Sequence, residues 1–408
     1  MAQRADVRVR PSWMLLGPAF VAAIAYVDPG NVAANVSAGA QFGFLLVWVV
    51  VVANAMACLV QYLSAKLGLV SGLSLPEAVG GRMRRRTRLV YWLQAELVAM
   101  ATDLAEVMGG AIALYLLFDL PLLTGGVITG AVSLLLLMVK DRRGQQMFER
   151  VITGLLLVIA IGFLTSLFVS PPPVDQVAAG LVPKFAGTES VLLAAAMLGA
   201  TVMPHAVYLH SGLARDRHGH PDPGPMRRML LRVTRWDVGV AMVVAGAVNL
   251  AMLLVAATNL QGQENTDSIE GAHAAVGGAL GPTVALLFAI GLLASGLASS
   301  SVGAYAGAMI MQGLLHVSIP MVARRLITLV PALAVLAVGI DASRALVLSQ
   351  VVLSFGIPFA LIPLVRLTSD RALMGDDINH RLTTAFGWIV AALITVLNVV
   401  LIYLTVKG

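Results

Sequence analysis

The chain has 408 residues, of which 59% are hydrophobic and only 12% are charged. Soluble domains average about 45–50% apolar and about 25% charged residues, so this composition excludes a water-soluble globular protein. The single cysteine, Cys58, excludes an intramolecular disulfide and with it a disulfide-stapled scaffold.

Long apolar stretches follow one another along the chain. A helix that crosses a bilayer needs about 20 mostly apolar residues, and eleven stretches meet that requirement. The longest expected loops, at 171–173, 215–232 and 259–278, are too short for a soluble domain, so we expect an all-α polytopic membrane protein. The expected spans are 12–37, 43–69, 89–117, 122–140, 150–169, 190–213, 236–258, 280–313, 323–340, 344–368 and 383–406.

The basic residues indicate how these spans are oriented. If the N-terminus is cytoplasmic, all of the 27 Lys and Arg except Lys184, Arg344 and Lys407 lie on the cytoplasmic side, including the arginines of residues 4–10. The positive-inside rule therefore predicts a multi-pass plasma (inner) membrane protein with its N-terminus inside and its C-terminus outside. The net charge of +6 then reflects topology, and no nucleic-acid partner is expected.

The first span is interrupted at Asp28-Pro29. Proline lacks an N–H and clashes with the carbonyl four residues earlier, which frees the oxygen of Ala25. Irregular backbone persists at membrane depth only where it lines a cavity or is buried in protein. An Asp at the bilayer centre costs roughly 2.5–3.5 kcal/mol on insertion scales, so Asp28 is difficult to explain by packing. Together with Asn31, this break is a candidate cation site.

The third span carries three acids, Glu96, Asp103 and Glu106, in an otherwise apolar helix. At about 100° per residue they fall on one stripe, so one face of this helix is polar. Arg324 and Arg325, near the start of the ninth span, are the basic pair expected to meet them. Both a proton relay and a purely structural network of ion pairs are consistent with this pattern.

The sixth span is interrupted at Met203-Pro204, as the first is at Asp28-Pro29. Pro204 frees the carbonyl of Ala200 beside the Met203 thioether. Prolines are common in membrane helices, and methionine mostly fills gaps in cores, so either feature alone indicates little. The coincidence of two breaks with donor side chains indicates a binding site.

The two broken spans each open a set of five. An odd number of spans inverts the second unit relative to the first, and transporters with such repeats bind substrate where the broken helices meet. The pattern predicts one transmembrane domain with an inverted five-plus-five repeat, 12–169 and 190–368, followed by an eleventh span at 383–406.

The predicted site combines hard and soft donors. Oxygens would come from Asp28, Asn31 and the carbonyls of Ala25 and Ala200, and a sulfur from Met203. Ca²⁺ and Mg²⁺ prefer oxygen ligands only, whereas a thioether favours softer transition metals. We therefore expect Mn²⁺ or Fe²⁺ as the bound ion.

The motifs Asp28-Pro-Gly-Asn31 and Met203-Pro-His205, within eleven spans, resemble the Nramp family of proton-coupled divalent metal transporters, particularly the bacterial manganese importers. The resemblance extends from Gly17 through the tenth span. It implies the LeuT-type fold.

The resemblance also implies functional residues. Gln350 in the tenth span stands where the family has a glutamine that approaches the metal, whereas Ala206 departs from the Asn that many members carry after Met-Pro-His. The implied metal ligands are Asp28, Asn31, Met203, Ala25, Ala200 and Gln350. The implied proton pathway comprises Asp28, His205, Asp103, Glu106, Glu96, Arg324 and Arg325.

Two of these residues have roles that their chemistry alone also suggests. Histidine has an ordinary pKa of about 6.5 and suits a proton relay, although a buried structural histidine would explain His205 equally well. Asp28 would release a proton when a cation binds, because a nearby positive charge favours the carboxylate. Asp103 is the first choice for the group that accepts this proton.

The expected function is secondary active import of Mn²⁺, and also Fe²⁺, coupled to protons by alternating access. The lipid bilayer, the metal ion and protons are the expected partners, without a cofactor or an obligatory protein partner. An amino-acid carrier of the same fold and a metal channel are the alternatives. The chain has no His-Glu-x-x-His, Gly-x-Ser-x-Gly or nucleotide-binding Gly-x4-Gly-Lys-Ser/Thr motif, so neither an enzyme nor an ATP-driven pump is expected.

Overall fold

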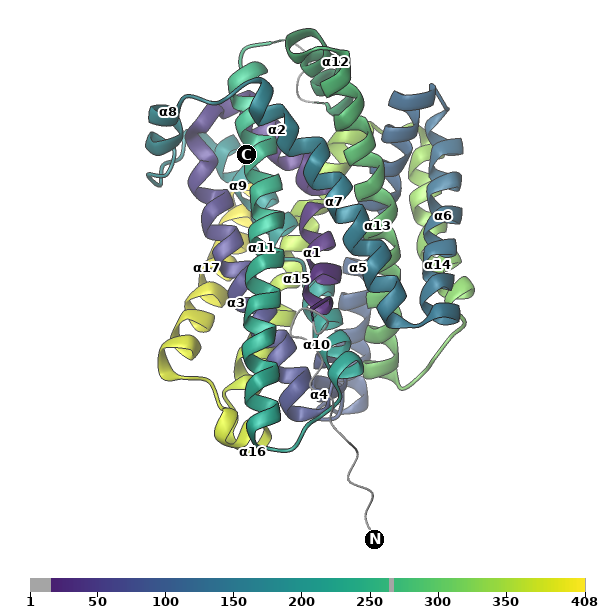
Figure 1. Ribbon diagram of the computed structural model, residues 1–408, viewed down its shortest axis with the longest axis vertical. Coiled ribbons are helices and arrows are strands. Elements are labelled where there is room, and N and C mark those ends of the chain that lie inside the picture. The colour runs from purple at the N-terminus through teal and green to yellow at the C-terminus, as the bar shows by residue number, and fades with distance from the viewer. Residues whose placement is uncertain (1–15, 264–267, 408) are drawn as a thin grey trace.

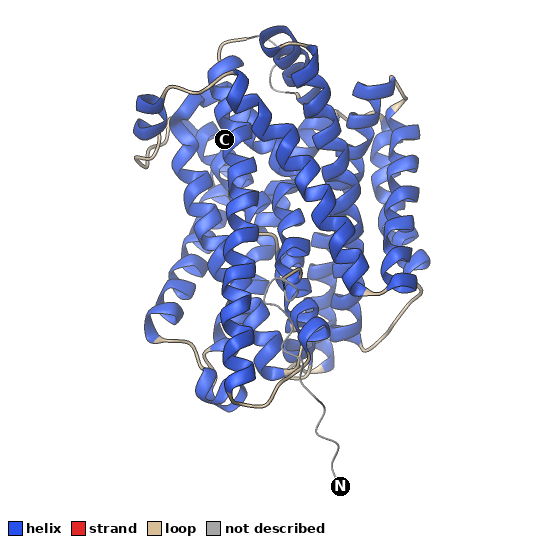
Figure 2. Cartoon of the chain, viewed as in Figure 1, coloured by secondary structure: helices blue, strands red, loops and turns tan. Residues whose placement is uncertain are grey.

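A computed structural model describes residues 16–263 and 268–407. These residues form helices joined by short loops, and the long helices run along the long axis of the molecule (Figure 1). The loops gather mostly at the two ends of the bundle (Figure 2). The start of the first expected span at residue 12 and the arginines of residues 4–10 lie outside the described ranges.

All eleven expected spans are helical, and the first and sixth are each divided into two shorter helices. The first span comprises α1 (Pro18–Ile24) and α2 (Pro29–Phe42), and the sixth comprises α9 (Gly187–Thr201) and α10 (Pro204–His218). The undivided spans are α3 (Val47–Ser71), α5 (Arg85–Phe118), α6 (Leu122–Arg143), α7 (Gln145–Val169), α11 (Pro225–Asn259), α13 (Pro282–Leu315), α14 (Met321–Val338), α15 (Ala342–Thr368) and α17 (Arg381–Lys407).

Nine helical stretches in the described ranges are long and apolar enough to cross a membrane. The number is two lower than eleven because Pro29–Ser71, which contains α2 and α3, is one stretch, and because α14 is not among the nine. The prediction of a polytopic all-α protein with two broken spans is confirmed. The limits of the two repeats stay a prediction.

Two of the three expected loops contain more helix than the sequence indicates, and this corrects those two predictions. The loop expected at 215–232 is largely helical, because α10 continues to His218 and α11 begins at Pro225, a residue suited to the first turn of a helix. The loop at 259–278 contains most of the unpredicted helix α12 (Ile269–Leu280), and the loop at 171–173 is followed directly by the unpredicted helix α8 (Val174–Ala179). Both helices are too short to span a bilayer.

Short helices mark the two ends of the bundle. α4 (Leu75–Gly80) and α16 (Arg371–Met374) lie at one end, called here the lower end, and α8 and α12 lie at the opposite, upper end (Figure 1). α17 runs from the lower toward the upper end (Figure 1). The remaining elements are short 3₁₀ turns, η2 (Ala25–Val27), η3 (Gly43–Leu46) and η4 (Gly375–Asp377).

Two prolines inside α15 are compensated by neighbouring helices. Pro358 frees the carbonyl of Ser354, which accepts a hydrogen bond from Asn398 Nδ2 of α17 at 2.8 Å. Pro363 likewise frees the carbonyl of Phe359, and the Tyr91 hydroxyl of α5 donates to it. Side chains of adjacent spans thus satisfy backbone groups that water cannot reach in a membrane.

The short first half-helix is held by a carboxylate. The backbone N–H groups of Gly17 and Ala19 donate to the Asp237 carboxylate of α11 at 3.1 and 3.0 Å. The first N–H groups of a helix have no partner within it, so an acid at this position satisfies them and favours the positive end of the helix dipole. α1 therefore begins at a defined place against α11.

Helices α5 and α13 approach each other closely. A Cβ atom added to Gly296 of α13 would lie 2.7 Å from the backbone nitrogen of Gly110 in α5. Small residues permit such backbone contact between membrane helices. This packing places the polar stripe of α5 directly against α13.

Candidate metal centre

The first break begins where Asp28 leaves the helical conformation. Its backbone is extended (φ −70°, ψ 168°), and its Oδ1 accepts a hydrogen bond from the Asn31 backbone N–H at 2.8 Å. Asp28 is thus the N-cap of α2 and precedes Pro29 at the first helical position, which is a favourable order for both residues. The side chain is completely buried.

The second break joins the first through a side chain. α9 ends at Thr201, Met203 is extended, and α10 begins at Pro204. Asn31 Nδ2 donates to the freed carbonyl of Ala200 at 2.8 Å and also to Asp28 Oδ1 at 2.6 Å. The two interruptions, half a chain apart in sequence, therefore meet inside the bundle.

Two oxygens at this junction lack hydrogen-bond partners within the described part of the chain. They are Asp28 Oδ2 and Gln350 Oε1, and both side chains have no exposed surface. An unsatisfied buried acceptor is costly, particularly when it is charged. A bound cation would satisfy both oxygens.

Gln350 of α15 lies between the two breaks. A Cβ atom added to Gly30 would lie 1.8 Å from Gln350 Nε2, and one added to Gly199 would lie 2.1 Å from the Gln350 backbone oxygen. At Gly199 the neighbouring atom belongs to the backbone, so only glycine fits, whereas a side chain at position 30 would have to displace the Gln350 side chain. The Gln350 carboxamide packs directly against the first turn of α2.

The remaining predicted ligands lie on the same broken segments. Met203 caps α10, and Ala25 opens the 3₁₀ turn that precedes Asp28; both are completely buried. Among the described residues there is no cluster of three or more His, Cys, Asp or Glu side chains that could hold a metal. A site here would depend on one carboxylate with amide, carbonyl and thioether donors, as the sequence predicts, and the individual ligand roles stay predictions.

The acids of α5 meet the arginines of α14. Arg324 Nη1 pairs with Glu96 Oε2 at 2.7 Å, and Arg325 Nη1 pairs with Asp103 Oδ1. Ser300 of α13 completes the second pair, since Arg325 Nη2 donates to its hydroxyl at 2.5 Å. The structure thus brings both predicted pairs together in the interior, and their function stays open.

Glu106 differs from the other two acids. It has no exposed surface, and neither carboxylate oxygen has a hydrogen-bond partner in the described ranges. Its Oε2 lies against Gly303 of α13, where an added Cβ would be 2.7 Å away. A buried acid without a partner is costly when ionised, which favours a residue that exchanges a proton.

His205 connects the second break with the acidic stripe. It is buried in the first turn of α10, and its Nδ1 lies 3.4 Å from the Thr102 hydroxyl of α5. Thr102 precedes Asp103 in α5, so this contact places His205 against the helix that carries the Asp103–Arg325 pair. Sequence reasoning did not identify Thr102.

Three small residues of α13, none of them predicted as a site residue, contact the buried charged groups. Ser300 contacts Arg325, Gly303 contacts Glu106, and Gly307 lies against Arg324, where an added Cβ would be 2.2 Å from Nη2. These positions follow a spacing of three and four residues, which is one face of a helix. This periodicity was the signal that could have identified them.

A second series of hydrogen-bonded buried side chains extends from the first break toward α3, α10 and α11. Gln61 Nε2 of α3 donates to the Tyr26 hydroxyl, and Gln61 Oε1 lies 2.7 Å from His210 Nδ1 of α10. Asn249 Nδ2 of α11 donates to the Tyr26 carbonyl at 2.7 Å. None of Gln61, His210 and Asn249 is among the predicted site residues.

The family model described as "natural resistance-associated macrophage protein-like", Nramp, matches residues 19–404 of the chain. This range includes both helix breaks, the acidic stripe and the arginine pair. The chain belongs to the Nramp family.

Known proteins resemble this Nramp chain over nearly its whole length. It is 72% identical over 408 residues to the divalent metal cation transporter MntH of Mycobacterium tuberculosis, covering 100% of this chain and 95% of that protein. A solved structure of the Eremococcus coleocola manganese transporter superposes with a TM-score of 0.85 at 32% identity, covering 95% and 86% of the two chains.

A more distant structure supports the fold alone. Mhp1, a nucleobase-cation-symport-1 family transporter, matches with a TM-score of 0.61 at 16% identity, covering 94% of this chain and 90% of that one. The fold of this Nramp chain is therefore of the LeuT type, as predicted, and it is a multi-pass membrane protein.

The Nramp motif of the sixth span departs from the common pattern at Ala206. Ala206 is completely buried and belongs to the same apolar core cluster as Met203. The methyl group thus lies in apolar surroundings where many family members carry an amide. The hydrogen bond from Asn31 to Ala200 does not involve this position.

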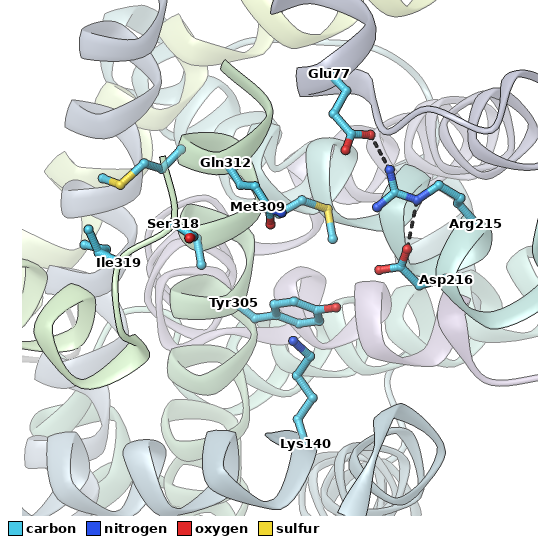
Figure 3. Close-up of a pocket in the computed structure, with 11 residues that line it drawn as sticks. Glu77, Lys140, Arg215, Asp216, Tyr305, Met309, Gln312, Ser318 and Ile319 are labelled. Carbon is cyan, nitrogen blue, oxygen red and sulfur yellow. Dashed lines mark hydrogen bonds and ion pairs between the residues drawn. The ribbon is translucent and has the colours of Figure 1, made fainter. Parts of the chain in front are cut away.

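A separate cavity of about 200 Å³ lies beside α4, α10 and α13. Arg215 of α10 pairs there with Glu77 of α4 and, at 2.8 Å, with Asp216 (Figure 3). The Lys140 ammonium lies 3.7 Å from the centre of the Tyr305 ring (Figure 3). None of the predicted metal or proton residues lines this cavity.

Proposed function

We propose that this chain is a secondary active transporter that imports Mn²⁺, and also Fe²⁺, together with protons by alternating access. The single observation that carries the proposal is the hydrogen bond from Asn31 to the Ala200 carbonyl, which brings two broken helices together around a buried carboxylate. Broken half-helices that meet in the bundle are the substrate sites of transporters with inverted repeats.

The donor set supports a transition-metal cargo. Asp28, Asn31 and Gln350 offer oxygens, the Ala25 and Ala200 carbonyls offer more, and Met203 offers sulfur. One carboxylate neutralises only part of a divalent charge, which suits an ion that must later be released. The named activities of the M. tuberculosis and E. coleocola relatives, divalent metal cation and manganese transport, agree with this cargo.

A proton route along α5 accounts for the buried polar groups that a metal site does not need. It would begin at Asp28, pass His205 and Thr102, and reach the Asp103–Arg325 pair. Glu106 and the Glu96–Arg324 pair would extend this route. Chains of acids and histidine are the usual components of proton relays in transporters.

The distribution of basic residues supports a plasma-membrane protein with a cytoplasmic lower end. The arginines that follow α4, those at the C-terminal end of α6 and those at the end of α10 all belong to segments that the charge rule assigns to the cytoplasm. The C-terminus would then face outward. A cofactor or an obligatory protein partner is not required by this mechanism.

The alternatives are less consistent with the site. An amino-acid carrier would hold a substrate carboxylate at the half-helix ends, where the buried Asp28 carboxylate would repel it. A channel would give metal flux that does not saturate, whereas the completely buried ligands require a conformational change for access.

The decisive experiment measures Mn²⁺ uptake and internal pH together in proteoliposomes. We expect uptake that saturates with Mn²⁺ concentration, rises when the outside is more acidic, and acidifies the lumen. Uptake that remains proportional to concentration would indicate a channel, and uptake without acidification would contradict proton coupling.

Replacement of Asp103 by Asn tests the proton route in the same assay. Because Asn cannot bind and release a proton, we expect Asp103→Asn to retain Mn²⁺ binding while metal-linked acidification falls at least about tenfold, or about 1.4 kcal/mol. Gln176→Asn, at an exposed position of α8, is the control. Unchanged pH-dependent uptake and proton flux in Asp103→Asn would remove Asp103 from the route.

A further inference from the structure

A groove of about 600 Å³ lies at the lower end of the bundle between α4 and the last turns of α15. Val79, Ile362 and Leu367 form its apolar wall, and Arg82 and Arg366 are its basic residues. It shares no residue with the metal centre or with the acidic stripe. The groove thus combines an apolar surface with a basic one, and it lies outside the proposed transport site.

The apolar wall continues onto a surface that faces lipid. Ala345–Thr368 of α15 is one of the stretches long and apolar enough to cross a membrane. Phe359 and Ile362 on this stretch are 47% and 37% exposed, so acyl chains would cover them in a bilayer. Arg366 follows Ile362 by four residues, which places it one turn nearer the membrane interface.

The basic residues are not neutralised by the acid beside them. Arg82 Nη2 lies 3.9 Å from Asp370 Oδ2, and the two side chains are 46% and 40% exposed, so this pairing is weak. Asp370 Oδ1 accepts the Ala372 backbone N–H at 2.9 Å as the cap of α16. Arg366 is exposed and forms no ion pair with other described residues. The groove therefore holds two guanidinium groups against one carboxylate.

We infer that this groove binds the phosphate headgroup of an anionic phospholipid. The guanidinium groups of Arg82 and Arg366 contact the phosphate, since arginine presents paired donors that match phosphate oxygens. An acyl chain lies along Ile362 toward Phe359. Basic pockets between membrane helices at the cytoplasmic side are suited to anionic headgroups. A free phosphate ion would use the arginines but leave the apolar wall uncovered, so the occupant is a lipid.

The test measures lipid binding to the purified full-length chain in neutral detergent. Phosphatidylglycerol, phosphatidylcholine and inorganic phosphate are titrated separately, with retained lipid detected by native mass spectrometry and thermal unfolding followed in parallel. The variants are Arg82→Gln, Arg366→Gln and both together. The control is Arg142→Gln with Arg143→Gln, which removes two exposed arginines at the end of α6.

We expect the apparent Kd for phosphatidylglycerol to rise about fivefold in each single variant and about thirtyfold in the double variant. The control variant and phosphatidylcholine binding should not change with these substitutions. Phosphatidylglycerol should raise the unfolding temperature of the wild-type chain but have a smaller effect on the double variant.

Three results would overturn the assignment. Unchanged phosphatidylglycerol affinity in the Arg82 and Arg366 variants would place lipid elsewhere, and equal binding of phosphatidylcholine would show that charge is not recognised. Protection by inorganic phosphate at matched concentration would indicate a free-anion site. The single variants decide the outcome if the double variant does not fold. Lipid binding is measured without metal transport, so its failure is distinguishable from failure of the proposed function.

Discussion

The Gln350 side chain fills the space that a Cβ atom at Gly30 would occupy. The distance of 1.8 Å from a Cβ at Gly30 to Gln350 Nε2 is far below van der Waals contact. Any larger residue at position 30 must displace the Gln350 side chain, whose own backbone is packed against Gly199 of α9. The position of a predicted metal ligand thus depends on the absence of a side chain.

Gly30→Ala tests this contact. We expect overpacking to lower the free energy of unfolding by about 1–3 kcal/mol and the displaced amide to weaken Mn²⁺ affinity about tenfold. Gly239→Ala is the matched control, because an added Cβ there meets no atom within 4 Å. Adding Gln350→Ala to Gly30→Ala should restore stability, as measured by thermal unfolding. Additive losses in this double variant would show that the two residues do not clash.

Met203→Ala tests the role of the sulfur in selectivity. Without the thioether the remaining donors are oxygens, which Ca²⁺ and Mg²⁺ accept. We expect Mn²⁺ uptake to persist while the preference for Mn²⁺ over Ca²⁺ falls about tenfold, or about 1.4 kcal/mol. Competition assays with Met197→Ala, another buried methionine of the same span, provide the control. Equal competition by Ca²⁺ in wild type and Met203→Ala would remove the sulfur from the site.

At the scale of helices, the sequence alone was sufficient to predict those features of a helix that depend only on its own residues. Pro29 and Pro204 break their helices through their own backbone chemistry, and the stripe of Glu96 and Asp103 follows from helical periodicity. The partners across the bundle were harder to predict. Asp237 holds the start of α1 from a helix more than 200 residues away, and periodicity within α11 contains no information about that contact.

The contact between α15 and α17 can be tested at Asn398, which donates to the carbonyl that Pro358 leaves without a partner. Asn398→Leu leaves the Ser354 carbonyl buried without a partner, so we expect a loss of about 1–3 kcal/mol in unfolding free energy. In a Pro358→Ala background the loss should be smaller, because the restored N–H of residue 358 can donate to that carbonyl. Denaturant unfolding of all four proteins measures the difference. If Asn398→Leu lowers the unfolding free energy equally in the wild-type and Pro358→Ala backgrounds, Asn398 does not compensate for the proline.

At the scale of the whole molecule, the charged residues belong to two separate sets. Glu96 and Asp103 of α5 are buried and paired with Arg324 and Arg325 of α14, whereas most of the other described arginines lie in loops or near the ends of helices. The buried arginines contribute to ion pairs within the bundle, and the exposed ones are those from which the charge rule predicts orientation. The sequence predicted both sets because they differ in position relative to the spans.

The orientation is open to direct labelling. Cys58 is the only cysteine, so Cys58→Ser provides a cysteine-free background. Gln176→Cys in α8 and Asp222→Cys between α10 and α11 then place one exposed thiol at the upper and one at the lower end. If the lower end is cytoplasmic, a membrane-impermeant maleimide labels Gln176→Cys in intact cells and labels Asp222→Cys only after permeabilisation. The reverse pattern would contradict the charge rule here and would turn the proposed import into export for the same alternating cycle.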